Sequence, residues 1–152
     1  MKQTADMDRI QGEMRPGVIT QTGFLGTDKR PLADILVADE AVVLRLGLTH
    51  PIIAARMRLF RAAAVQGLGL DMNLESHFEA RIDGARGKMP CPFGHRGLFE
   101  KTFTIVRNLR LNEEITFTDL NIHMIDEHGF YEGEGAAFRL PPERLVRVLE
   151  IT

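Results

Sequence analysis

The chain has 152 residues, with 19 Lys and Arg against 21 Asp and Glu, and 44% of its residues are apolar. A chain of this length and balanced composition can bury one core, which excludes extended disorder, collagen and coiled coil. Its single cysteine, Cys91, excludes an internal disulfide and fits a reducing compartment. No apolar stretch reaches the length of a membrane span or a signal sequence, so we expect a cytoplasmic protein with no membrane contact.

The first part of the chain separates into a polar start and a helical segment. Residues 1–17 show no apolar periodicity, and we expect a flexible N-terminal arm followed by a single globular domain over 18–152. Apolar residues then recur with helical spacing over 32–46 and again over 52–64. The connection between these segments is short and includes the N-cap candidate Thr49, which predicts an antiparallel helical hairpin.

Two charged residues interrupt the apolar faces of this hairpin. Asp39 falls in the first apolar stripe and Arg56 falls in the second. Buried charges are rare unless they are paired, and both residues lie at a similar distance from the turn. We therefore predict a structural ion pair between Asp39 and Arg56 that fixes the register of the helices. A ligand anchor at a cleft is the alternative interpretation.

The middle of the chain has the alternation of a β-sheet. Apolar and polar residues alternate over 70–82, and a second apolar alternation covers 101–111. The Gly- and Pro-rich stretch 84–100 between them is expected to be a long loop. A solvent-exposed polar face on each strand favours antiparallel pairing.

Two short helices complete the expected fold. Thr118 is an N-cap candidate with Asn121 at the capping-box position, and Gly129 ends this helix. Pro142 opens the last helix. The predicted fold class is α+β, with an N-terminal antiparallel helical hairpin packed on a small, mostly antiparallel sheet and two later short helices.

The stretch around Cys91 is the strongest candidate for chemistry. Prolines on both sides hold the backbone near the only thiol in an extended form, and His95 follows within one turn. In one hypothesis, Cys91 is a reactive thiol with His95 as its base. A cysteine that packs inward as a small apolar side chain is the simpler interpretation.

In a second hypothesis, Cys91 and His95 bind zinc. A proline after the cysteine and a glycine shortly after it are typical of the tight turns of zinc knuckles, although Phe93 stands where a second cysteine is wanted. Two further ligands must then come from elsewhere, and we select His77 and His128. The remaining candidates for these two positions are His123 and Glu132.

Two neighbouring segments of the chain differ in charge. Residues 81–110 hold seven Lys or Arg and two acidic residues, whereas residues 111–138 hold seven acidic residues and no Lys or Arg. We expect these segments to face each other within the fold or across a homodimer. Within the acidic segment, Asp119, His123 and Glu127 share a helix face, which we interpret as solvated.

The sequence argues against nucleic acid as a partner. The net charge is slightly negative, the 118–128 helix carries no Lys or Arg, and the chain has no Trp and one Tyr for base stacking. No motif assigns an enzyme activity. We therefore expect a non-catalytic cytosolic binding or interaction domain, with a metal- or thiol-dependent site at Cys91 and His95 as the alternative, and the sequence leaves open whether that site would be an enzyme or a sensor.

Overall fold

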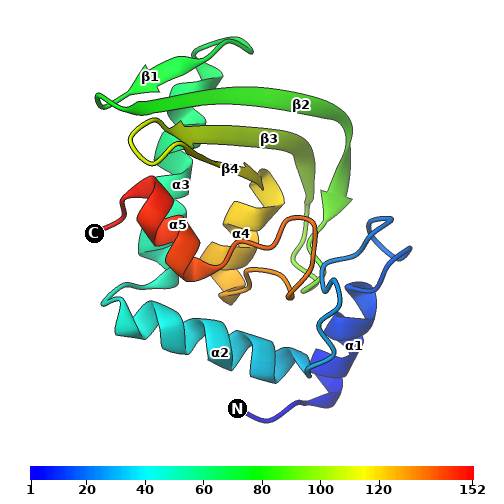
Figure 1. The fold of residues 1–152 in the computed structure, drawn as a ribbon. Coiled ribbons are helices and arrows are strands. Elements are labelled where there is room, and N and C mark those ends of the chain that lie inside the picture. Colours follow the sequence, from blue (N-terminus) through cyan, green and yellow to red (C-terminus); the bar gives the residue numbers. More distant parts are fainter.

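The computed structural model describes residues 1–152 and contains five helices and one four-stranded antiparallel sheet, which confirms the α+β class (Figure 1). In chain order the elements are α1 (Ala5–Glu13), α2 (Leu32–Arg45), α3 (His50–Val65), β1 (Met72–Leu74), β2 (Phe78–Pro90), β3 (Leu98–Asn108), β4 (Glu113–Thr118), α4 (Asp119–His128) and α5 (Pro142–Leu149).

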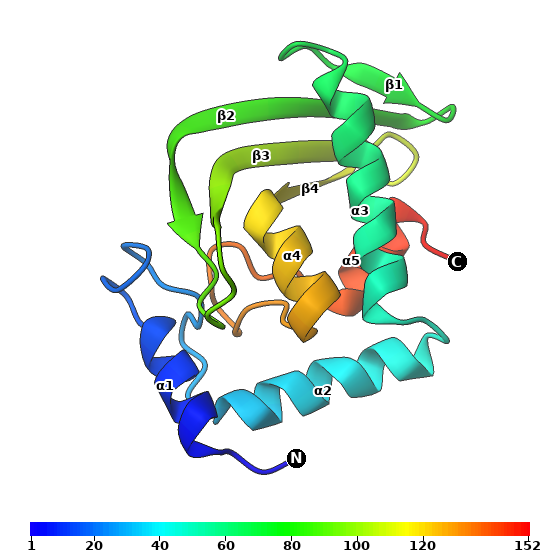
Figure 2. The same cartoon turned by 180° about the vertical axis from the view of Figure 1, so that it is seen from behind.

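The sheet has the strand order β1-β2-β3-β4, so each strand pairs with its neighbour in the chain. Strands β2 and β3 form a long hairpin that arches over α4 and bends down at its closed end (Figures 1 and 2). The main core lies between the sheet and α3, α4 and α5. A second apolar cluster, made by α1, α2, α4 and the closed end of the hairpin, lies under the bend. The bend therefore brings the tip of the hairpin to the side of α4.

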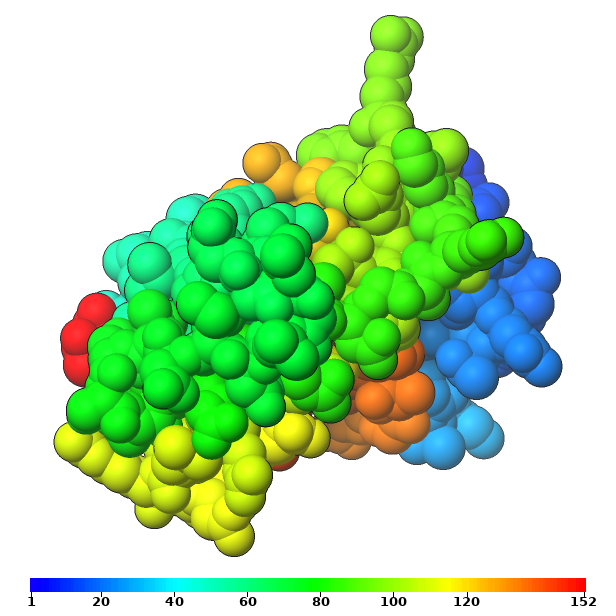
Figure 3. All heavy atoms as spheres, turned by 90° about the horizontal axis from the view of Figure 1, so that it is seen from above, coloured from blue at the N-terminus to red at the C-terminus, as the bar shows by residue number.

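The prediction of a loop over 84–100 is wrong, because most of this stretch belongs to the paired strands β2 and β3. Lys88 pairs with Glu100 after a shift of register that begins at Gly84, and only residues 91–97 form the turn. Side chains over 84–88 are exposed on both faces of the strand. The sequence there shows no alternation of apolar and polar residues that would predict a strand. Figure 3 shows this hairpin, green to lime, spread across one face of the molecule with the blue N-terminal segment beside it.

Residues 1–17 differ from the flexible arm that we expected. They contain α1, whose Ile10 is buried, and Met14 after it has no exposed surface. Gln11 also ties α1 to α2, because its side-chain oxygen accepts from the backbone N–H of Leu32 at 2.8 Å. Two buried apolar residues were too few to give a helical period in the sequence, yet they are enough to pack the segment on the second cluster.

Helices α2 and α3 occur where the sequence places them, with Thr49 as the N-cap of α3. They do not lie along each other, however. Helix α2 runs across the end of α3 and packs on α1 and α5 (Figures 1 and 2). The two apolar stripes therefore do not face each other as they would in an antiparallel hairpin.

The crossing of α2 and α3 explains why the predicted Asp39–Arg56 ion pair is wrong. Asp39 is buried, with 4% of its surface exposed, but it pairs with both terminal nitrogens of Arg139 at 2.6 and 2.8 Å. Arg56 donates instead to Glu75 at 2.8 Å and to the carbonyl of Leu149 at 2.9 Å. Asp39 is buried and Arg56 is half-buried, but the partner of each comes from a different segment than we predicted.

The acidic segment does lie against the basic one, because β4 pairs with β3 and places Glu114 opposite Arg107, but its ion pairs are made elsewhere. Its carboxylates pair with arginines from other helices: Asp119 with Arg61 at 2.6 Å and Asp126 with Arg58 at 2.7 Å, both across the contact between α4 and α3. None of the helices combines the length and the apolar character needed to cross a bilayer.

Candidate metal centre

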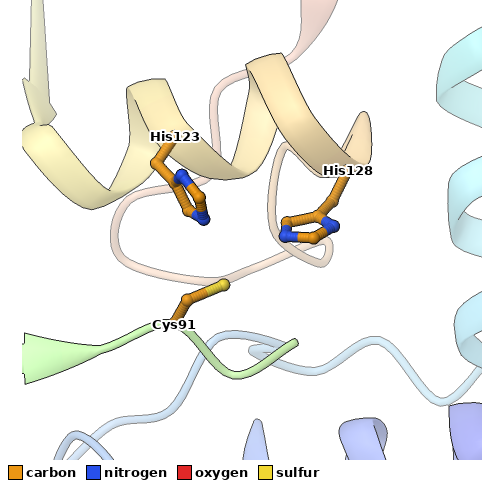
Figure 4. A group of neighbouring side chains, drawn as sticks. All are labelled: Cys91, His123 and His128. Carbon is orange, nitrogen blue, oxygen red and sulfur yellow. The ribbon is translucent and has the colours of Figure 1, made fainter. Parts of the chain in front are cut away.

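The turn that closes the β2–β3 hairpin presents Cys91 to the interior. Gly94 donates its backbone N–H to the carbonyl of Cys91 at 3.0 Å and has a φ of 89°, which glycine adopts without strain. The side chain of Cys91 points away from solvent toward α4 (Figure 4), and only 3% of its surface is exposed. A tight turn at the hairpin tip thus places one sulfur atom under the helix.

Two features of the surroundings of Cys91 shift the pKa of its thiol in opposite directions. Burial raises the pKa of the Cys91 thiol, and backbone N–H groups of Phe93, His95 and Gly94, which donate to the sulfur, act in the opposite direction. A buried thiol with a raised pKa is a poor nucleophile, so the geometry argues against the reactive-thiol hypothesis. The same N–H groups would stabilise a thiolate bound to a cation.

Helix α4 supplies two imidazoles to the same place. The capping box of Thr118 and Asn121 fixes where α4 begins, and Gly129, with a φ of 62°, ends it directly after His128. His123 and His128 both project toward Cys91 (Figure 4). One ligand atom from each of Cys91, His123 and His128 lies within 4.8 Å of the other two. We call these three residues the Cys–His cluster.

His95 stands at the exposed side of the Cys–His cluster. Its Nδ1 is 3.1 Å from Nε2 of His123, and its ring centroid is 4.5 Å from that of His128. In a tetrahedral zinc site, Zn–N bonds of about 2.0–2.1 Å put two nitrogen ligands about 3.3 Å apart, and a nitrogen and a sulfur about 3.6 Å apart. The separation between His95 and His123 is thus close to one edge of such a tetrahedron.

The rings are held by aromatic neighbours. Phe93 stacks on His128 with centroids 4.0 Å apart and planes at 7°, and Phe99 lies 4.5 Å from the ring of His123. Nε2 of His128 is buried and has no hydrogen-bond partner. A buried polar atom without a partner loses its hydration without compensation, and a bound metal ion at this position would provide that compensation.

The histidines of the cluster are in the form that binds metals. Burial, followed by the charges of His95 and His123, lowers the pKa of His128 to about 4. Burial and the charge of His95 also lower the pKa of His123, although the helix face with Asp119 and Glu127 had indicated a solvated imidazole. Neutral imidazoles offer a free lone pair at neutral pH.

Of the predicted zinc ligands, the structure brings Cys91 and His128 together, places His95 against His123 and His128 at the edge of that group, and leaves His77 elsewhere. The side chain of His77 packs on Phe78, and its Nε2 is 2.6 Å from a carboxylate oxygen of Glu150. His77 precedes β2 and therefore lies at the opposite end of the hairpin from the turn. The bent hairpin carries the turn to α4 and leaves His77 far along the strand.

His123 takes the place that we gave to His77, and the sequence does contain a signal for it. Three residues separate Cys91 from His95, and four separate His123 from His128. Both intervals fall within the ligand spacings of zinc fingers, with His95 where the second cysteine usually stands. Treating the two pairs as one motif would have selected His123.

Comparisons with family models, with curated proteins and with solved structures gave no match for this chain. The geometry of the site is therefore the basis on which a function is inferred.

Proposed function

We propose that this protein binds one zinc ion through Cys91, His123 and His128, with His95 as the fourth ligand. The observation that supports this proposal is the convergence of a thiol and two imidazoles from a hairpin turn and a helix, with ligand atoms within 4.8 Å of one another. Helix capping and the turn at Gly94 position these side chains without any metal contact.

The chemistry of the ligands favours zinc over other ions. Magnesium and calcium prefer oxygen ligands, and none belongs to the Cys–His cluster. Thiolate sulfur and imidazole nitrogen are both ligands of zinc. A trigonal set of one cysteine and two histidines with a weak axial ligand is instead a copper site, so a fourth strong ligand such as His95 favours zinc. The thiol would release its proton on binding, and the neutral histidines would bind without releasing one.

The proposed role of the ion is structural. Four protein ligands leave no open position for substrate, which is the arrangement of structural zinc sites. The ion would join the tip of the β2–β3 hairpin to α4, two segments otherwise held together by the second apolar cluster. In this proposal the protein is a non-catalytic binding domain that zinc stabilises.

The test is the metal content of the purified full chain, together with cobalt substitution. We expect about one zinc per chain, and we expect cobalt to give the near-ultraviolet absorption of a thiolate ligand. Cys91→Ser should abolish that absorption and strongly weaken binding. His77→Ala is the matched control, since this histidine lies outside the cluster, and it should keep full metal content.

Substitution of His95 distinguishes a zinc site with four protein ligands from a site with three. If His95 closes the site, His95→Ala should weaken zinc binding about tenfold or more in competition with a chelator, which is about 1.4 kcal/mol or more. Unchanged affinity would remove His95 from the ligand set and leave an open position. Failure of the natural chain to bind zinc or cobalt would refute the proposal as a whole.

A cytosolic location and a homodimer belong to the proposal as expectations from the sequence. The free, buried thiol of Cys91 fits a reducing compartment. Light scattering at low and high salt tests the dimer. A monomer at every concentration would end that part of the proposal and leave the zinc site untouched.

A further inference from the structure

A partly open cavity of about 190 Å³ lies beside α4, between the segment around Thr22, the β2–β3 hairpin and α4. Its wall is mainly apolar and aromatic. The apolar residues in the wall are Phe24, Met89, Phe103, Leu120, Met124 and Phe138. Cavities of roughly this size with apolar walls accept molecules about as large as benzene.

One carboxyl group, that of Glu132, stands in this apolar wall. Glu132 has 3% of its surface exposed, and its Oε2 accepts from Nδ2 of Asn121 at 2.6 Å. The orientation of that amide is fixed, because Oδ1 of Asn121 accepts from the backbone N–H and the hydroxyl of Thr118. The other carboxyl oxygen, Oε1, makes no hydrogen bond within the protein. The cavity therefore contains an acceptor that lacks a donor.

The loop that carries Glu132 is held in an unusual conformation. The φ of Glu132 is 69°, a left-handed conformation that few residues other than glycine adopt. The next residue, Gly133, donates its N–H to the carbonyl of Phe24 at 2.9 Å, and Arg139 donates to the carbonyl of Glu132 at 2.7 Å. Backbone strain of this kind persists only when the surroundings impose it, and it concentrates at functional sites.

No cation of the protein neutralises this carboxyl group. The charge of Arg139 acts on this carboxyl, but its terminal nitrogens are engaged by Asp39 and by the carbonyl of Glu132. Lys101 also lines the cavity and makes no ion pair with Glu132. Burial raises the pKa of Glu132 to about 7, against the opposing effects of Asn121 and Arg139. A donor that also carries positive charge would be the best complement to this site.

We propose that this cavity binds a small organic ammonium compound, whose amino group donates to Oε1 of Glu132 and whose apolar body fills the space between the aromatic side chains. The proposal does not depend on zinc, because none of the Cys–His cluster lines the cavity.

The test uses the full chain as purified and three probes of one shape: benzylamine, benzyl alcohol and benzoate. The chain has seven methionines, and only Met89 and Met124 line the cavity. With methyl-labelled methionine, we expect benzylamine to shift these two methyl resonances and leave the other five in place. Benzylamine should bind about tenfold or more tightly than benzyl alcohol, as charge-assisted hydrogen bonds are stronger than neutral ones.

Substitution of the carboxyl group completes the test. Glu132→Gln keeps an acceptor for Asn121 but removes the charge, so the preference for benzylamine over benzyl alcohol should disappear. The wild-type methyl shifts provide an answer that does not depend on this variant. The proposal is overturned if benzylamine leaves Met89 and Met124 unshifted, or if benzyl alcohol binds as tightly. Stronger binding of benzoate, lost in Lys101→Met, would likewise overturn it and assign the cavity to an anion.

Discussion

Glu132 should make the stability of the protein depend on pH in a direction opposite to that of most carboxylates. Burial raises the pKa of Glu132 from its ordinary 4.5 to about 7 in the folded chain. Between these values the folded chain holds a proton that the unfolded chain has released. The free energy of unfolding therefore falls as the pH rises through this range, and it levels off above about pH 7.

The magnitude follows from the same two pKa values. Each pKa unit between the folded and unfolded chain corresponds to about 1.4 kcal/mol, so the ionised carboxyl costs about 3 kcal/mol at alkaline pH. Glu132→Gln removes this titration and keeps the hydrogen bond from Asn121. Relative to the wild type, the variant should gain about 2–3 kcal/mol of stability between about pH 5 and about pH 8.

The assay is urea denaturation of both proteins over this pH range. Every other titrating group is common to the two chains, including the Cys–His cluster, so the difference between the two stability profiles isolates Glu132. Parallel profiles would show that the carboxyl titrates normally and is hydrated, and the reasoning about its burial would be refuted.

Denaturant unfolding of three further variants tests the packing of α1, of α2 and of the loop that follows α4. Asp39→Asn should destabilise the protein by about 3–5 kcal/mol, because it leaves the guanidinium of Arg139 buried without its counter-ion; a loss below about 1 kcal/mol would contradict a buried pair. Gly133→Ala should cost about 1–3 kcal/mol, since the added Cβ would lie 2.4 Å from the carbonyl oxygen of Leu25. Gly12→Ala, with open space around the new Cβ in α1, should instead stabilise by up to about 1 kcal/mol; equal effects at the two glycines would refute the packing argument.

The sequence predicted best where local signals agree with one another. The capping box at Thr118 and Asn121 and the stop at Gly129 gave both ends of α4, and Pro142 gave the start of α5. These signals act through hydrogen bonds and backbone preferences within a few residues, so no knowledge of the tertiary fold is needed. The part of the hairpin within 84–100 was missed because its pairing involves backbone atoms and exposed side chains.

The candidate site was predicted in part for a related reason. The turn around Cys91 and the position of His95 are local features, and both could be recognised. His123 stands on a helix with acidic neighbours, and that context alone indicates a surface histidine. Which imidazoles reach the sulfur depends on how far the hairpin bends toward α4 (Figure 4).

The amino-acid sequence by itself determined the ends of α4, the start of α5, the α+β class and the burial of Asp39, because these follow from local capping and from the exclusion of water from apolar stripes. Tertiary structure decided the pairings: Asp39 with Arg139, His123 with the Cys91 turn, and Glu132 with an apolar cavity. The physical reason is that a buried charged or metal-binding side chain requires a partner, but its burial does not determine which residue becomes that partner. The partner is chosen by the crossing of α2 over α3 and by the bend of the hairpin, which many weak contacts set together.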